Sequence, residues 1–364
     1  MSHDRTTQDE PAVRSGRWPM LNTEDRRTMQ RSAGVRSAWL IVCVGAVLLA
    51  VVGSVLVGSS SISPGEAWQA LLDGGVPLTD AAVAVREVRL PRTVTAVLVG
   101  AAMGAAGALM QGVTRNPLAD PGILGVNAGA AFMVVVAIGV FGLATPSRFL
   151  WFAFAGALGA TVLVYALGNR GPARGSPVMM TLAGAAVTIL LTSASSILLL
   201  TDRAGQLVFA RWSVGSLEGA RLTVIGQLAP FLLLGIALAI VSGRLLNALS
   251  LGEEVARGLG QRVGPARVIV LAAVTLCCGA GTAAAGPVSF VGLAVPHLAR
   301  RMVGPDYRWV TGLSVLLGAV FLLLADIAGR VIVAPSVLPA GALTAIIGGP
   351  VFIALAQSRR LREL

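Results

Sequence analysis

The chain contains no lysine: all 28 of its basic residues are arginine. A P-loop that binds ATP needs a lysine on the phosphates, and a Schiff-base enzyme needs one as its nucleophile. Neither site can be built from this sequence. Any ATP hydrolysis that drives this protein must therefore be carried out by another polypeptide.

Histidine and cysteine are also scarce. The two histidines are His3, in the N-terminal tail, and His297, near an expected helix end, so a zinc site has too few ligands, and no HExxH motif is present. We expect His297 to cap a helix or to meet a partner surface. The three cysteines lie inside apolar runs and are expected to be small packing residues without disulfides. The sequence thus predicts no catalytic residue, no metal and no cofactor.

Charge is the third deficit. Only 12% of the 364 residues are charged while 55% are hydrophobic, and the mean hydropathy is +0.80. A soluble domain carries about 25% charged residues, so a soluble globule of this size could not cover its surface with polar groups. The net charge of +11 does not indicate nucleic-acid binding, because the arginines lie at the chain ends and between apolar runs. The composition is that of a multi-pass membrane protein.

Ten apolar segments predict an all-α polytopic membrane protein with ten transmembrane helices. Most segments are close to the ~20 residues that cross a bilayer, and the short one at 288–298 contains Pro296. The segments are 38–58, 93–113, 127–144, 149–168, 178–200, 222–242, 268–286, 288–298, 310–329 and 341–357.

An even number of crossings places both termini on one side of the membrane. With the N-terminus inside, 20 of the 28 arginines are cytoplasmic, so the positive-inside rule selects this orientation in the cell membrane. Residues 1–36 are polar and are expected to form a disordered cytoplasmic tail. Residues 37–358 form the transmembrane domain, and 359–364 form a basic cytoplasmic tail.

Small residues are concentrated in two stretches, 100–107 and 279–286. Such stretches let helix backbones approach closely in lipid. The two stretches run in opposite directions across the membrane, which predicts an inverted repeat that relates spans two to five to spans seven to ten. Close helix packing alone explains the glycines equally well.

Ionisable groups are nearly missing from the spans. Asp326 is the exception, and Arg330 follows it by four residues, so the two can pair on one helix face. Secondary carriers usually need several intramembrane acids, which disfavours a proton-coupled transporter.

On the outer face, Pro91 is expected in the first turn of span two, where it holds Arg89 and Arg92 together at the membrane surface. Contact with lipid headgroups is the alternative role for these arginines.

The loop 243–267 contains a short amphipathic stretch on the inner face. It is too short to cross the membrane, and it is either a simple connector or a helix that docks into a groove on a partner. Its candidate residues are Leu251, Gly252, Glu253, Glu254, Arg257, Gly258 and Gly260.

These motifs together resemble the FecCD-type permeases, the membrane subunits of ABC importers for ferric siderophores, haem and cobalamin. The similarity extends over residues 37–358, in order and with family-like spacing. The residues that carry it include Arg89, Pro91, Arg92, Asn116, Pro117, Asp120, Pro121, Gly122, Gly252, Glu254, Pro296, His297, Asp326 and Arg330.

The resemblance implies a type II ABC importer permease fold and several partners. These are a second permease subunit, identical or paralogous, two cytoplasmic ATPase subunits and an extracytoplasmic substrate-binding protein. In the family, arginines matching Arg89, Arg92 and Arg330 meet acidic residues of the binding protein, and the segment matching Leu251–Gly260 fits a cleft on the ATPase.

The resemblance also suggests a substrate and an inner gate. The expected substrate is an iron(III)–siderophore complex, with cobalamin or haem as the alternative and a proton-coupled carrier as a remote one. Relatives can have small hydroxyl residues that narrow the exit before span five. This chain has Ser176, Pro177 and Val178 there, and only Ser176 keeps that character.

Overall fold

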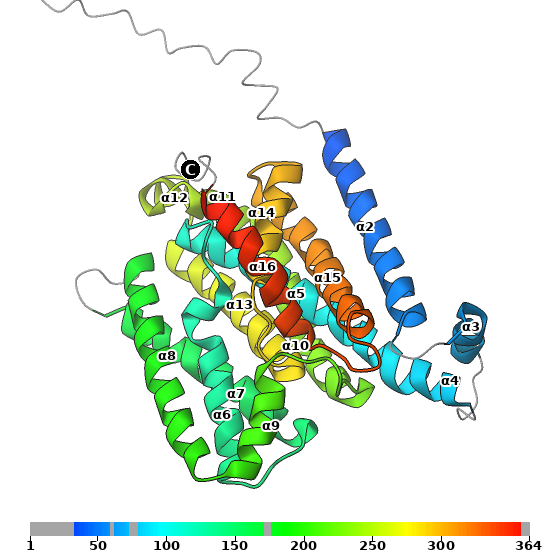
Figure 1. The fold of residues 1–364 in the computed structure, drawn as a ribbon. Helices are drawn as coiled ribbons and strands as arrows, with labels where there is room; N and C mark the ends of the chain where they lie inside the picture. Colours follow the sequence, from blue (N-terminus) through cyan, green and yellow to red (C-terminus); the bar gives the residue numbers. More distant parts are fainter. Residues whose placement is uncertain (1–32, 59–61, 73–78, 171–175, 358–364) are drawn as a thin grey trace, which may run out of the picture.

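The structure is a computed structural model that describes residues 33–58, 62–72, 79–170 and 176–357, and every regular element in this part is helical (Figure 1). The expected tails 1–32 and 359–364 lie outside the described residues. Residues 33–36, which we assigned to the N-terminal tail, instead form the first turn of helix α2 (Ala33–Leu56).

Seven helices in the described part are long and apolar enough to cross a membrane. Three shorter helices, of 14, 13 and 18 residues, coincide with the remaining expected segments. Seven of the ten expected segments therefore form helices that are long and apolar enough to cross a membrane. The long helices are α2, α5 (Leu90–Thr114), α7 (Pro146–Gly168), α8 (Pro177–Leu200), α10 (Leu222–Val241), α13 (Val263–Ala285) and α15 (Tyr307–Val331). The short ones are α6 (Val126–Gly139), α14 (Val291–Val303) and α16 (Ala340–Gln357).

Smaller helical elements connect these spans. On one membrane face, the connector consists of α11 (Gly243–Ser250) and α12 (Glu253–Gly258), and we call this the connector face. The opposite face carries α3 (Pro64–Leu72), α4 (Asp80–Val83), the wide turn η1 (Ala84–Arg89) and α9 (Arg203–Ser213). The 3₁₀ turn η2 (Pro121–Leu124) precedes α6.

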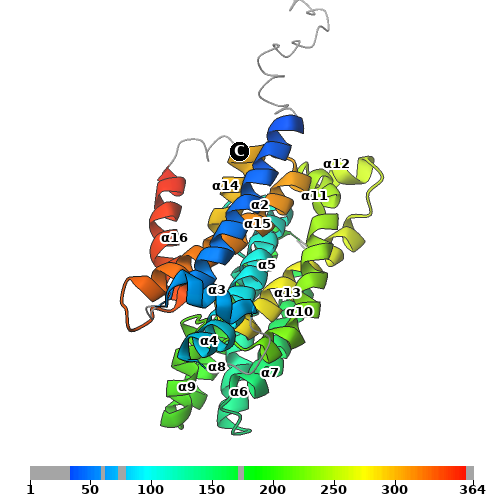
Figure 2. The ribbon, with the colours of Figure 1, turned by 90° about the vertical axis from the view of Figure 1, so that its right-hand side faces the viewer.

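Helix α5 is the centre of the molecule. It packs against α15, α13, α10 and α14, and Figure 2 shows it running between α15 and α13. Gly100 and Gly104 lie against the backbone of α15 at Ser314 and Gly318, and Gly107 lies against Gly292 of α14. A Cβ atom at any of these glycines would collide with the facing backbone, so the small residues set the helix spacing, as the sequence predicted.

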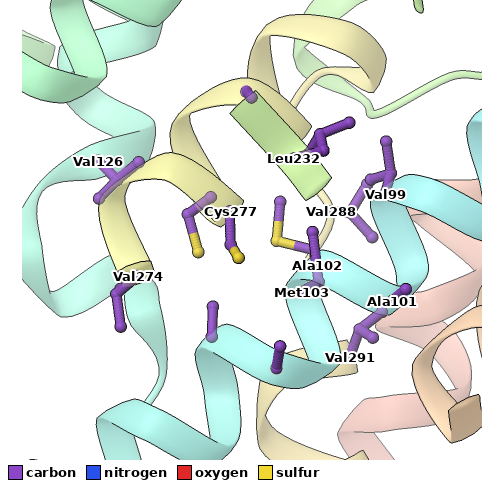
Figure 3. Close-up of a cluster of buried hydrophobic side chains, with 14 of the residues drawn as sticks. Val99, Ala101, Ala102, Met103, Val126, Leu232, Val274, Cys277, Val288 and Val291 are labelled. Carbon is purple, nitrogen blue, oxygen red and sulfur yellow. The ribbon is translucent and has the colours of Figure 1, made fainter. Parts of the chain in front are cut away.

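A hydrophobic core fills the space where α5, α10 and α13 meet. Figure 3 shows Val99 and Met103 of α5 near Leu232 of α10 and Cys277 of α13. Leu232 and Cys277 are fully buried, and the cysteines at 43, 277 and 278 are all free and buried. The expectation that the cysteines are small packing residues is confirmed.

The same packing order occurs in two sets of four helices. In the first set α6 packs against α7 and α8, and α7 packs against α8; in the second set α14 packs against α15 and α16, and α15 packs against α16. The first helices of the sets, α5 and α13, contact each other, and each also contacts the third helix of the other set. In both sets a long helix is followed by a short one.

Candidate functional site

The expected outer arginines belong to a buried cluster that joins three helices. The Nη2 atom of Arg92 lies 2.6 Å from Oδ1 of Asp326, and the Nη2 atom of Arg330 lies 2.7 Å from Oδ2 of the same carboxylate. Arg92, Asp326 and Arg330 are only 3%, 0% and 2% exposed. Two cations therefore share one anion, so the group carries a net positive charge inside the protein. We call it the arginine–aspartate cluster.

The arginines also bind the end of helix α2. Arg330 donates to the carbonyl oxygens of Ser54 (2.8 Å) and Val57 (3.0 Å), and Arg89 donates to the two carbonyl oxygens between them (3.0 and 2.8 Å). The last four carbonyls of a helix have no partner within it, and cations are favoured at this end of the helix dipole. Arg89 and Arg330 thus cap α2, and Arg92 joins α5 to α15 through Asp326, so the three arginines hold α2, α5 and α15 together.

This geometry corrects the exposure that we expected for Arg89, Arg92 and Arg330. Sequence alone places the three guanidinium groups near one membrane face, but it does not reveal that α2 ends at the same level. Its free carbonyls and Asp326 bind the guanidinium groups internally, so a docking protein cannot reach them in this conformation. Direct contact with a partner remains a proposal.

Pro91 lies in the first turn of α5, as expected. The turn η1 runs into α5 without a break, so the helical stretch continues from Asp80 to Thr114. A proline interrupts the regular hydrogen-bonding pattern because it has no N–H and its ring crowds the preceding turn. The chain responds with the wide turn η1, in which the Leu90 N–H donates to the Val85 carbonyl five residues back.

The motif at 116–122 forms two tight turns before α6. The Asn116 Oδ1 atom accepts a hydrogen bond from the Leu118 N–H (2.9 Å), and the Asp120 Oδ1 atom accepts one from the Gly122 N–H (2.8 Å). Asp120 caps the turn η2, which begins at Pro121. The ring of Pro121 packs against Gly292, so this motif brings η2 into contact with α14.

The motif around Pro296 shows a pairing that sequence reasoning missed. Pro296 lies inside α14 and leaves the Gly292 carbonyl without its usual donor. The buried side chain of Gln111 in α5 donates from Nε2 to the carbonyls of Gly292 (3.2 Å) and Leu293 (3.1 Å), and its Oε1 atom accepts from Arg300. The signal was a lone glutamine within a small-residue helix. His297 is half-buried within α14 and does not cap its end.

The connector folds as the sequence predicted, with a short helix between glycines. Gly252 and Gly260 adopt φ values of +109° and +80° on either side of α12, where L side chains are strained. Glu253 forms ion pairs with Arg257 (3.3 Å) and with Arg267 of α13, whereas Glu254 is exposed. Glu253 therefore orients α12, and Glu254 remains available to a partner.

The connector carries three exposed apolar side chains, of which Leu251 was among the expected site residues, whereas Val255 and Leu259 were not. Leu251 precedes α12, Val255 lies within it and Leu259 follows it directly, and their side chains are 63%, 49% and 66% exposed. We call these three residues the apolar stripe. The connector lies beyond the spanning helices, so this apolar stripe is the surface that a protein partner would cover.

The expected inner gate lies at the start of α8. The Ser176 Oγ atom accepts a hydrogen bond from the Met179 N–H (3.2 Å), so this hydroxyl caps the helix. Pro177 is the first helical residue and Val178 is 67% exposed. The neighbouring residues 171–175 lie outside the described part of the chain.

Comparison with known proteins gives a consistent result. Residues 46–358 match the FecCD transport family. The chain is 42% identical over 334 residues to the ferric enterobactin transport system permease protein FepD of Escherichia coli (strain K12), covering 90% of this chain and 98% of FepD. It is 39% identical over 323 residues to YfiZ of Bacillus subtilis (strain 168), named a probable siderophore transport system permease protein, covering 88% of this chain and 96% of YfiZ.

A solved structure has the same fold. It is a metal-chelate type ABC transporter in an inward-facing conformation, and it matches with a TM-score of 0.76 and 27% identity, covering 87% of this chain and 98% of that one. Relatives at similar identity are named hemin and cobalamin import permeases. The chain is a multi-pass membrane permease subunit of an ABC importer and is not itself an enzyme. It belongs to the FecCD transport family.

Proposed function

We propose that this permease transports an iron(III)–siderophore complex into the cytoplasm. The observation that carries the proposal is the 42% and 39% identity, over nearly the whole chain, to permeases named for enterobactin and siderophore transport. The described structure also contains no group of three or more His, Cys, Asp or Glu that could hold a bare metal ion. This supports transport of a chelated iron complex selected by an external binding protein.

We further propose that two such permeases form the pathway and that both termini are cytoplasmic. The repeated packing order of α5–α8 and α13–α16 supports an inverted repeat, with the three short helices completing ten crossings. The connector face is then cytoplasmic, and the stripe of Leu251, Val255 and Leu259 would be buried against an ATPase subunit. Residues 176–178 would narrow the exit.

The external binding protein would dock on the opposite face, over the ends of α2, α5 and α15. The arginine–aspartate cluster would act there as a positioning group that holds the three helix ends in register. A proton-coupled carrier is less well supported, because the Asp326 carboxylate is already paired with two arginines.

Uptake by reconstituted proteoliposomes tests the proposal. The chain is combined with its partner permease, the ATPases and the binding protein, and ⁵⁵Fe–siderophore, cobalamin and hemin are offered in turn. We expect ATP-dependent accumulation of the iron–siderophore, with cobalamin and hemin at background. Accumulation of cobalamin or hemin instead would assign the alternative substrate, and uptake that uncouplers abolish without ATP depletion would indicate a secondary carrier.

A further inference from the structure

An apolar groove of about 340 Å³ lies between α7 and α13, away from every site described above. Its walls are formed by Leu158, Val162 and Tyr165 on α7 and by Val268, Ala272 and Leu276 on α13. Tyr165 and Val268 lie toward the connector face, where α7 ends and α13 begins. The groove therefore runs along the spanning helices, within the depth of the hydrocarbon core.

Apart from the Tyr165 hydroxyl, the polar side-chain groups in the groove walls are already hydrogen-bonded. The two threonines donate their hydroxyls to backbone carbonyls one turn back, Thr161 to Ala157 (3.0 Å) and Thr275 to Leu271 (2.7 Å). A polar substrate would lose its hydration and gain few hydrogen bonds in return. A hydrocarbon chain is the occupant that this lining favours.

Two arginines flank the end of the groove at the connector face. Arg170 lies two residues beyond the end of α7 and Arg262 immediately precedes α13, so both lie past Tyr165 and Val268 toward the connector face. Both are exposed, and neither is among the ion pairs of the described residues. Arg267, beside them in sequence, is already paired with Glu253.

We propose that the groove binds one anionic glycerophospholipid of the leaflet at the connector face. One acyl chain would fill the space between α7 and α13, and the phosphate headgroup would contact Arg170 and Arg262. Basic pockets between transmembrane helices select anionic headgroups in this way. A second copy of the chain fits less well, because it would bring more arginines of a chain with net charge +11 against these two.

Native mass spectrometry of the purified full-length chain tests this proposal. The protein is taken from bilayers of phosphatidylglycerol and phosphatidylcholine with identical acyl chains, and the retained lipids are counted. We expect one phosphatidylglycerol to be retained preferentially. Ala272→Phe, which fills the groove from an exposed position, should abolish that retention. Ala237→Phe, at an exposed position on α10, is the matched control and should leave it unchanged.

The headgroup contact has its own variants, which alter only exposed side chains. Arg170→Gln and Arg262→Gln should each weaken the preference for phosphatidylglycerol about fivefold, and Arg244→Gln on α11 should not. Equal retention of the two lipids by the unmodified chain would overturn the proposal. An Ala272→Phe variant that retains its lipid would also overturn the proposal. If that variant lost dimers while its lipid retention stayed the same, the groove would be an interface between two copies of the chain.

Discussion

At the scale of single residues, the arginine–aspartate cluster makes a prediction that separates structure from docking. Asp326→Ala leaves Arg92 and Arg330 buried without their anion. Removing one member of a buried ion pair costs about 3–5 kcal/mol, so the thermal unfolding midpoint of the purified protein should fall by several degrees. Arg221→Ala, at an exposed position, should change it little.

The burial of the cluster also predicts how the stability loss in Asp326→Ala depends on salt. Buried pairs are screened much less than exposed ones, so the stability lost in Asp326→Ala should be nearly the same at low and high salt. An Asp326→Ala protein with normal stability but weak, salt-sensitive association with its binding protein would contradict the capping role and restore direct docking.

Gln111 gives a second prediction at this scale. Gln111→Leu changes the side-chain volume little. It leaves the Gly292 and Leu293 carbonyls and the Arg300 guanidinium without their hydrogen-bond partner. A buried group that loses its hydrogen bond costs about 1–3 kcal/mol. We expect a lower unfolding midpoint in Gln111→Leu and an unchanged one in Gln227→Leu, an exposed position on α10. Equal midpoints for the two variants would refute the pairing.

At the scale of elements, the connector should be required for ATPase association. Val255→Asp places a charge in the exposed apolar stripe and should reduce co-purification of the ATPase subunits, and Glu254→Arg should weaken it through an exposed charge. Both positions face solvent, so expression and unfolding midpoint should stay normal. Glu218→Arg is the matched charge reversal on the opposite membrane face. Full ATPase association in Val255→Asp would remove the stripe from the interface.

Helix α3 provides a pH prediction outside the membrane. The backbone N–H of Ser63, and then its hydroxyl, donate to the Glu66 carboxylate at 2.9 Å each, and these bonds lower the pKa of Glu66. A lowered pKa means that the carboxylate stabilises α3 above the unfolded pKa of about 4.3, and that this contribution is lost as the pH falls through the folded pKa.

Ser63→Ala removes the hydroxyl bond and should move this acid transition to higher pH. The fluorescence of Trp68, which is 60% exposed on the same helix, reports it when the signal of Trp68→Phe is subtracted. Superimposable titrations with and without Ser63→Ala would show that the hydroxyl contributes nothing to the lowered pKa.

Sequence predicted the elements better than their contacts. The apolar segments located every long helix, because hydropathy and length depend on local residues alone. The connector helix followed from its flanking glycines for the same reason. Pro91 was correctly placed in the first turn of α5, but the wide turn η1 before it was missed, because no residue pattern in the motif indicates it. The role of Gln111 depends on a carbonyl 181 residues away, which only the fold brings close.

At the scale of the whole molecule, the proposed orientation predicts which surface positions are accessible from each side of the membrane. A cysteine introduced for Arg257 should react only with a membrane-impermeant maleimide supplied on the cytoplasmic side, and one introduced for Glu218 only with reagent supplied outside. The three native cysteines are buried and should stay unlabelled. Labelling of both positions from the same side would rule out the proposed orientation of the connector face.

The arginine–aspartate cluster also has a consequence for biogenesis. Arg92 and its carboxylate partner are 234 residues apart, and at about 5–20 residues per second the ribosome needs roughly 10–50 s to span that distance. Helix α5 therefore leaves the insertion machinery with an unneutralised guanidinium and must wait for α15. During that interval, water, lipid headgroups or a membrane chaperone must solvate the Arg92 guanidinium. In a chain truncated before α15 the guanidinium would never be neutralised, and the chain would stay a substrate for quality-control proteases.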